Sequence, residues 1–233
     1  MAQYSLDPIS SNCYPDSTVL INKFGITDES SLLDLEIAIT QEAIARWEKT
    51  PLSSSFNFNH YKAIHKHLFD ELYDWAGHTR DVNISKKGTR FCPYDEIEAH
   101  AGRIFSRLRA TNVLVGLKKN AFVSEFVELY MVTNYLHPFR EGNGRTQRLF
   151  LSQLARYAGY SLNFADIDTD NLMVATIQSA HGVRDGLNHI FKRSINTPKK
   201  PSLLDDLQMN IELVEQNKLK QGAPKRSKRD MEL

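Results

Sequence analysis

Apolar residues recur every three or four positions along most of the chain, which is the spacing of one buried helix face. Between residues 31 and 47, for example, the stripe consists of Leu32, Leu35, Ile39, Ala43 and Ile44. Similar stripes predict further helices over residues 58–73, 94–111, 120–136, 144–158 and 169–192, the last with a break near Gly182. The pattern therefore predicts a mainly helical protein.

One segment, residues 80–91, departs from the helical pattern. Val82 and Ile84 alternate with polar residues, and the positions that follow are Lys86, Lys87 and Gly88. Alternation that leads into polar residues and a glycine is typical of a short β-hairpin. We therefore expect an all-α fold that carries one short β-hairpin.

The organisation of the chain changes near residue 198. Two prolines and two lysines occupy positions 198–201, and such a stretch does not extend a helix. The final residues are rich in lysine and arginine and poor in apolar residues, which is typical of disorder. We expect a folded domain over residues 1–197 and a linker with a basic, disordered tail over residues 198–233.

Composition narrows the class of protein. The hydrophobic fraction is 41%, the charged fraction 24% and the formal net charge +1, so neither a nucleic-acid partner nor a membrane is indicated. Two cysteines, Cys13 and Cys92, do not have the spacing of metal ligands. No apolar stretch reaches the roughly 18 residues of a membrane span. We expect a cytoplasmic protein, and secretion into a host cell stays open.

Residues 137–148 are the segment that indicates chemistry, and they read His-Pro-Phe-Arg-Glu-Gly-Asn-Gly-Arg-Thr-Gln-Arg. Gly142 and Gly144 allow a backbone to approach a ligand closely, and the loop leads into the start of a predicted helix. The free N–H groups at a helix N-terminus favour anions. A phosphate group fits such a place.

Two arginines follow the glycines. Arg145 and Arg148 are three residues apart on the predicted helix, hence on neighbouring parts of one face. Guanidinium groups match phosphate oxygens with two parallel hydrogen bonds. The segment therefore predicts a polyphosphate site, and the alternative is that both arginines are ordinary surface residues.

His137 and Glu141 supply the remaining chemistry. A histidine accepts a proton near neutral pH, so His137 is a candidate general base. A glutamate carboxylate beside phosphates is a typical Mg²⁺ ligand, so Glu141 is a candidate metal ligand. The alternatives are a core histidine without catalytic function and an acidic residue that only favours the helix dipole.

With these residues in view, the chain resembles the Fic family. The family motif is His-Pro-Phe-x-Asp/Glu-Gly-Asn-Gly-Arg-x-x-Arg, and the chain matches every fixed position from His137 through Arg148. Residues 14–26 and 72–80 also resemble the corresponding parts of bacterial Fic toxins, and the predicted hairpin falls where the family has its flap. The resemblance covers residues 10–195.

The resemblance implies transfer of AMP from ATP, with Mg²⁺, to a Tyr, Ser or Thr hydroxyl of a target protein. In that scheme His137 is the base and Glu141 holds the metal. The nucleotide-binding residues implied are Gly142, Asn143, Gly144, Arg145 and Arg148. The flap residues implied to dock the target by strand addition are Ile84, Ser85, Lys86, Lys87 and Gly88.

Gly144 favours AMP transfer, because Doc-type relatives that phosphorylate their targets have lysine at this position. Two other functions stay open at the level of sequence. One is transfer of a different nucleotide, or removal of AMP. The other is a silent nucleotide-binding module, which would have no need of the intact His137 and Glu141.

Regulation and partners are also implied by the resemblance. Many Fic proteins carry an inhibitory Ser/Thr-x-x-x-Glu-Gly/Asn helix, and this sequence shows none. We therefore expect a toxin that is restrained by a small separate antitoxin, whose glutamate reaches Arg148. Type II topoisomerase subunits are the targets that the toxin-like lead-in implies.

Overall fold

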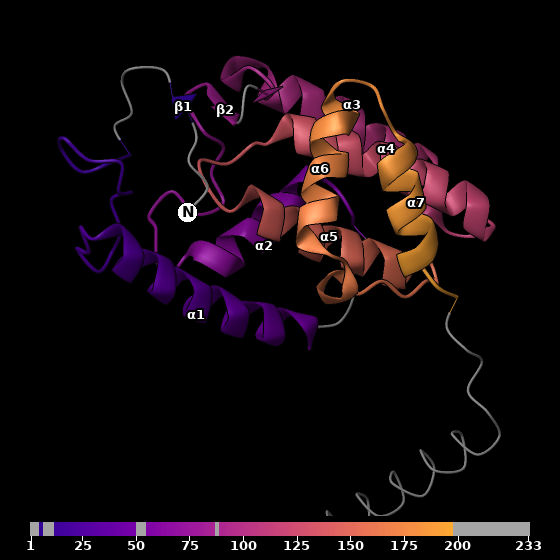
Figure 1. The fold of residues 1–233 in the computed structure, drawn as a ribbon, viewed down its shortest axis with the longest axis horizontal. Coiled ribbons are helices and arrows are strands. Elements are labelled where there is room, and N and C mark those ends of the chain that lie inside the picture. Colours follow the sequence, from indigo (N-terminus) through magenta and orange to yellow (C-terminus); the bar gives the residue numbers. More distant parts are fainter. Residues whose placement is uncertain (1–4, 7–11, 50–54, 87–88, 198–233) are drawn as a thin grey trace, which may run out of the picture. The chain divides into compact units, whose positions relative to one another are not determined.

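The computed structural model describes residues 5–6, 12–49, 55–86 and 89–197. Seven α-helices lie in these residues: α1 (Glu29–Glu48), α2 (Phe58–Phe69), α3 (Ile97–Ala110), α4 (Lys119–Leu136), α5 (Asn143–Tyr157), α6 (Thr169–Ala180) and α7 (Asp185–Ser194) (Figure 1). Short 3-10 turns at Tyr94–Glu96, Asn112–Leu114 and Phe164–Asp166 lie between them. The expected mainly helical fold is confirmed. The predicted tail over residues 198–233 lies outside the described residues.

Three helices begin where a polar side chain caps the first turn. Asp28 accepts a hydrogen bond from the Ser31 N–H at the start of α1, and Asn57 and Asp168 do the same for α2 and α6. Each cap satisfies one N–H group that the helix itself cannot pair. These caps explain why helices begin at these positions.

The predicted end of α2 is wrong by four residues. The helix ends at Phe69, whereas Leu72 and Tyr73 lie outside any helix and are nevertheless fully buried. Both side chains continue the apolar stripe into the core after the helical backbone has stopped, so periodicity alone does not mark the end. The break near Gly182 is confirmed, because Gly182 has φ +87° between α6 and α7.

The β-hairpin is part of a small antiparallel sheet in the order β1–β2–β3. Strands β2 (Ile84–Lys86) and β3 (Thr89–Arg90) form the expected hairpin. Strand β1 (Ser5–Leu6), which the sequence does not predict, pairs with the other edge of β2, Ser5 opposite Ser85 and Leu6 opposite Ile84. Within the described residues, β2 is therefore paired on both sides.

Helices α4 and α5 hold the centre of the helical arrangement. Helix α4 packs against α3, α5, α6 and α7, and α5 packs against α2. Aromatic rings fill the space near the α4–α5 loop, where Tyr61 stacks on Phe139 and meets the edge of Phe150. This packing fixes the loop that carries residues 137–142. Among the described helices, none is long and apolar enough to cross a membrane.

Candidate active site

The loop between α4 and α5 makes a sharp reversal. His137 ends α4 in the left-handed conformation with φ 39°, and Gly142 begins α5 with φ 76°. A Cβ atom at Gly142 would lie 2.2 Å from Cζ of Phe69, so both the backbone angle and the space require glycine. The sequence predicts that this glycine lets the backbone approach a ligand, whereas the group that lies against it in the structure is the Phe69 ring.

His137 is nearly buried, with 8% of its surface exposed. Its ring stacks on Phe91 at 3.7 Å between centroids, and Nδ1 lies 3.1 Å from the Asn134 carbonyl oxygen. Because a carbonyl only accepts, Nδ1 carries the proton and Nε2 is the basic nitrogen. Burial lowers the pKa of His137 to about 3, with the positive charges of Arg80 and Lys86 adding to the effect.

Arg80 holds the histidine end of the loop. Its Nε donates to the His137 carbonyl at 2.9 Å, and its backbone N–H donates to the Pro138 carbonyl at 2.8 Å. The guanidinium also donates to the carbonyls of Val82 and Cys92, which flank the hairpin. One buried side chain thus joins the motif loop to both ends of the flap.

His65 holds the other end of the loop. Its Nδ1 accepts the Gly77 N–H at 2.8 Å, so Nε2 carries the proton and donates to the Glu141 carbonyl at 3.0 Å. The ring also stacks on Phe139 at 3.8 Å. Burial lowers the pKa of His65 to about 3, which keeps the ring neutral in the role of a bridge.

Glu141 presents a nearly buried carboxylate, with 7% of the residue exposed. Oε1 accepts the Gly142 N–H at 2.8 Å and lies 3.8 Å from Nη2 of Arg145. Within the described part of the chain, Oε2 accepts no hydrogen bond. Burial raises the pKa of Glu141, whereas the Gly142 N–H lowers it.

The two motif arginines point to different places, although the sequence puts them on neighbouring parts of one face. Arg148 is exposed and lines a cavity, while Arg145 turns away toward α1, where Nη2 lies 2.5 Å from Oε1 of Glu36. The surrounding protein partly desolvates Arg148 and lowers its pKa. A buried carboxylate on another helix therefore separates the two guanidinium groups.

Asn143 closes the loop on itself. Its Oδ1 accepts the Phe139 N–H at 2.8 Å, and its Nδ2 donates to the Phe139 carbonyl at 2.7 Å. Only 3% of the residue is exposed. The Asn143 side chain shapes the loop, and the backbone at the α5 N-terminus stays next to the cavity.

The cavity beside the loop has a volume of about 340 Å³. Its lining joins residues from the loop, α5, the hairpin and α6, among them His137, Phe91, Gly144, Arg148, Lys86 and Met173. Of the sequence-predicted site residues, Gly142, Asn143, Arg145 and Glu141 do not line it. The base candidate and one arginine candidate thus share a cavity large enough for part of a nucleotide.

The flap residues lie at the hairpin. Ile84 is buried at 4% exposure, whereas Ser85 and Lys86 are half-buried in β2. Lys87 and Gly88, which complete the predicted docking segment, lie outside the described residues. The described part of the flap therefore borders the cavity through Lys86.

Three buried residues that shape the site were not among the sequence candidates: Glu36, His65 and Arg80. The sequence does contain a signal for Glu36, because this residue has the helical spacing of the buried positions in α1. It lies four residues after Leu32 and four before Thr40, and both are buried. A charged residue at a core spacing needs a buried partner. For His65 and Arg80 no local pattern points to the loop that they hold.

Comparison with known proteins supports a common origin. A sequence model described as the Fic/DOC family matches residues 55–155. Protein adenylyltransferase VbhT of Bartonella schoenbuchensis is 38% identical over 182 residues, 78% of this chain and 38% of VbhT. A probable protein adenylyltransferase, y4lH of Sinorhizobium fredii, is 38% identical over 177 residues, 76% of this chain and 89% of y4lH.

The chain belongs to the Fic/DOC family. It spans 38% of the length of VbhT but 89% of the length of y4lH. Among solved structures, the BepC effector protein of Bartonella tribocorum with bound AMPPNP is similar, with a TM-score of 0.76 and 26% identity over 81% of this chain and 97% of that one.

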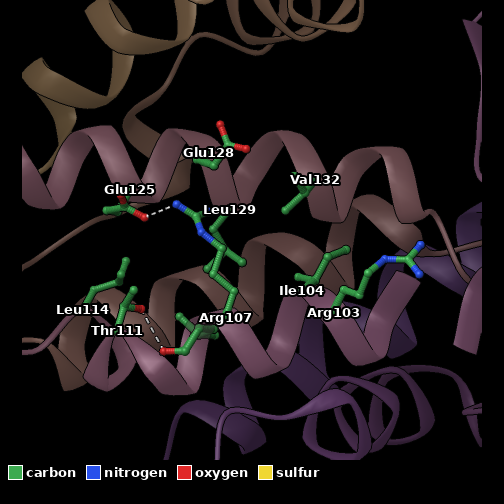
Figure 2. Close-up of a pocket in the computed structure, with 10 residues that line it drawn as sticks. Arg103, Ile104, Arg107, Thr111, Leu114, Glu125, Glu128, Leu129 and Val132 are labelled. Atoms are coloured by element: carbon green, nitrogen blue, oxygen red, sulfur yellow. Dashed lines mark hydrogen bonds and ion pairs between the residues drawn. The ribbon is translucent and has the colours of Figure 1, made fainter. Parts of the chain in front are cut away.

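A second cavity of this Fic/DOC chain lies between α3 and α4 and has a volume of about 240 Å³. Figure 2 shows Ile104, Leu129 and Val132 beside it, and a dashed line that marks the pair of Arg107 and Glu125. The two charged groups of this pair are 2.8 Å apart. It shares no described lining residue with the cavity at His137. The Fic/DOC motif therefore faces only the first of these two cavities.

Gly142→Ala tests the constraint on the motif loop of this Fic/DOC chain. The added Cβ meets Phe69 and the backbone is strained, so we expect a loss of about 2–4 kcal/mol in the free energy of unfolding. Gly25→Ala is the matched control, because Gly25 has φ +67° with open space around it, and should lose about 1 kcal/mol. Urea unfolding measures both, and equal losses would rule out the Phe69 contact as the constraint.

Proposed function

We propose that this chain transfers AMP from ATP to a Tyr, Ser or Thr hydroxyl of another protein. The observation that carries the proposal is the shared cavity, which His137 and Arg148 line together with Gly144 in the first turn of α5. The adenylyltransferase names of the relatives and the AMPPNP in the BepC structure agree with this activity.

His137 acts as the general base in this proposal. The target hydroxyl gives its proton to Nε2, and its oxygen forms a bond to the α-phosphorus of ATP. The bond from that phosphorus to the bridging oxygen breaks, and pyrophosphate leaves with the electron pair. The Asn134 carbonyl at Nδ1 and the Phe91 ring hold the imidazole in the tautomer that this step needs.

The phosphates are held by the start of α5 and by Arg148. Asn143 and Gly144 would supply backbone N–H groups at the positive end of the helix dipole, whereas the Gly142 N–H already donates to Oε1 of Glu141. Arg148 forms no ion pair within the described residues, so its guanidinium is available to an anion in the cavity. A Cβ at Gly144 would lie 3.2 Å from Nη1 of Arg148, so a larger residue would press on this guanidinium. An open Gly144 supports AMP transfer over Doc-type phosphorylation.

Glu141 would hold the Mg²⁺ that accompanies the nucleotide. The donor fits, because Mg²⁺ commonly takes one or two carboxylates together with phosphate oxygens and water. Glu141 offers Oε2 for this purpose while Oε1 is fixed by the Gly142 N–H. When bound, the ion would neutralise charge on the phosphates.

The target protein would dock as an extended segment against the outer edge of β2, where main-chain hydrogen bonds position its hydroxyl. In this structure β1 pairs with that edge through Ser85 and Ile84. A docking segment must therefore take the place of the chain's own residues 5–6. Lys87 and Gly88 would extend the same docking segment.

Two partners complete the proposal. A small antitoxin would place a glutamate on Arg148, since the sequence has no inhibitory motif of its own and Arg148 is exposed. Type II topoisomerase subunits are the proposed targets, on the strength of the toxin-like segment at residues 14–26. A protein that acts on these two partners would act in the cytoplasm.

His137→Ala tests the reaction. We expect labelling of proteins by α-labelled ATP to fall about 10²- to 10⁴-fold, because the general base is lost. Lysates incubated with labelled ATP, GTP, UTP or CTP provide the measurement, and mass spectrometry of the labelled band identifies the residue that gains AMP. Labelling that persists in the variant, or that requires another nucleotide, would contradict the proposal. His181→Ala, an exposed histidine at the end of α6, is the control.

The pH dependence of the reaction follows from the low pKa of His137. With a pKa of about 3 in the free protein, the base stays unprotonated, so kcat/KM should not fall between pH 7 and 5.5 through this group. An ordinary histidine would lose about tenfold at pH 5.5. Nucleotide phosphates raise the pKa in the complex, so kcat should decline at a higher pH than kcat/KM does. Initial rates measure both profiles, and an acid limb of kcat/KM near pH 6.5 would refute this assignment.

Deletion of residues 2–6 tests the docking edge. Without β1 the edge of β2 is open, so we expect the KM for the target to fall severalfold while the KM for ATP is unchanged. Steady-state labelling with varied target and varied ATP separates the two values. A rise in the target KM would mean that the N-terminal strand supports the flap and does not compete with the target.

A further inference from the structure

Arg145 lies between two buried carboxylates. Its Nη2 is 2.5 Å from Oε1 of Glu36 and 3.8 Å from Oε1 of Glu141. The guanidinium carbon sits 4.7 Å from the centre of the Phe69 ring, which closes one side. Nη1 of Arg145 also donates to the Thr40 hydroxyl at 3.4 Å. Four groups of the protein therefore fix this arginine without any contribution from a ligand.

Glu36 is held as firmly as Arg145. Only 1% of the residue is exposed, and its second oxygen, Oε2, accepts the Tyr73 hydroxyl at 2.5 Å. It belongs to α1, outside residues 55–155, and α1 packs against α2. A carboxylate this deeply buried is stable only because Arg145 compensates its charge.

The position of Arg145 decides how much negative charge Glu141 presents. Glu141 lies just before α5 and Arg145 lies in the first turn of α5, and their charged groups are 3.8 Å apart. Without a competitor, the guanidinium would close the 3.8 Å separation and neutralise Glu141. The charge of Glu36 holds it on the α1 side, at the shorter of the two distances.

We propose that Glu36 is a positioning residue of the nucleotide site, which holds Arg145 against α1 and so leaves the Glu141 carboxylate available to the divalent cation that accompanies the nucleotide. This inference rests on the function proposed above. It assigns Arg145 to the control of charge at Glu141, in place of the phosphate grip that the sequence predicts. Arg148 remains the arginine that faces the cavity.

Glu36→Gln is the direct test. The neutral amide releases Arg145 to Glu141, so the Mg²⁺ concentration at half-maximal binding of AMPPNP should rise about tenfold. Binding of AMPPNP without Mg²⁺ should stay within about twofold of the wild-type protein, since Arg148 and the α5 N-terminus are intact. Isothermal titration calorimetry at several Mg²⁺ concentrations measures both values without turnover.

A second substitution separates charge control from structural support. In the double variant Glu36→Gln with Arg145→Gln, the guanidinium that would neutralise Glu141 is gone, so the Mg²⁺ dependence should return to within about threefold of the wild-type value. Failure of this rescue would mean that Arg145 binds the nucleotide itself, and would overturn the proposal. Glu42→Gln is the control on α1, because Glu42 forms an exposed pair with Arg46.

The remaining outcomes are also decisive. If Glu36→Gln lowers the thermal midpoint but leaves the Mg²⁺ dependence unchanged, Glu36 is only structural. If that variant does not fold, Tyr73→Phe removes one of the two contacts on Glu36 and should shift the Mg²⁺ dependence the same way by about twofold; no shift refutes the role. If the wild-type protein itself shows no Mg²⁺-dependent AMPPNP binding, the proposed function fails as well.

Discussion

The hydrogen bonding of the motif-loop backbone is the constraint on which the site depends. The loop between α4 and α5 is short, reverses through two left-handed residues and lies in the core, so its carbonyls need partners from elsewhere. Arg80 satisfies His137 and Pro138, and His65 satisfies Glu141. Because these partners come from α2 and from the segment before the flap, the base, the α5 N-terminus and the hairpin share one rigid frame.

In this frame, two buried carboxylates share one guanidinium group. Glu36 and Glu141 are both nearly buried, and Arg145 forms an ion pair with each of them. An anionic substrate would add further negative charge next to them. Such a site favours a cation together with the anion, which is how nucleotides normally enter proteins. The arrangement of the two carboxylates thus agrees with the chemistry assigned to the cavity.

Much of this could be predicted from the sequence, because the signals were local. Helix stripes, caps and the contiguous motif each depend on neighbouring residues, and the structure has the helices and the hairpin where they were expected. The direction of Arg145 could not be predicted, because it depends on Glu36, more than 100 positions away in sequence. The end of α2 was missed for a related reason, since Tyr73 is buried by tertiary packing after helical periodicity has ended.

Strand β1 gives the flap a further property. A segment of the same chain acts on β2 at an effective concentration on the order of millimolar, whatever the abundance of other proteins. An extended peptide that pairs with β2 more weakly than the tethered β1 does not displace β1. Ser5 and Leu6 would therefore exclude peptides that pair weakly with β2. Backbone pairing depends little on sequence, but this competition would still limit which proteins dock on the flap.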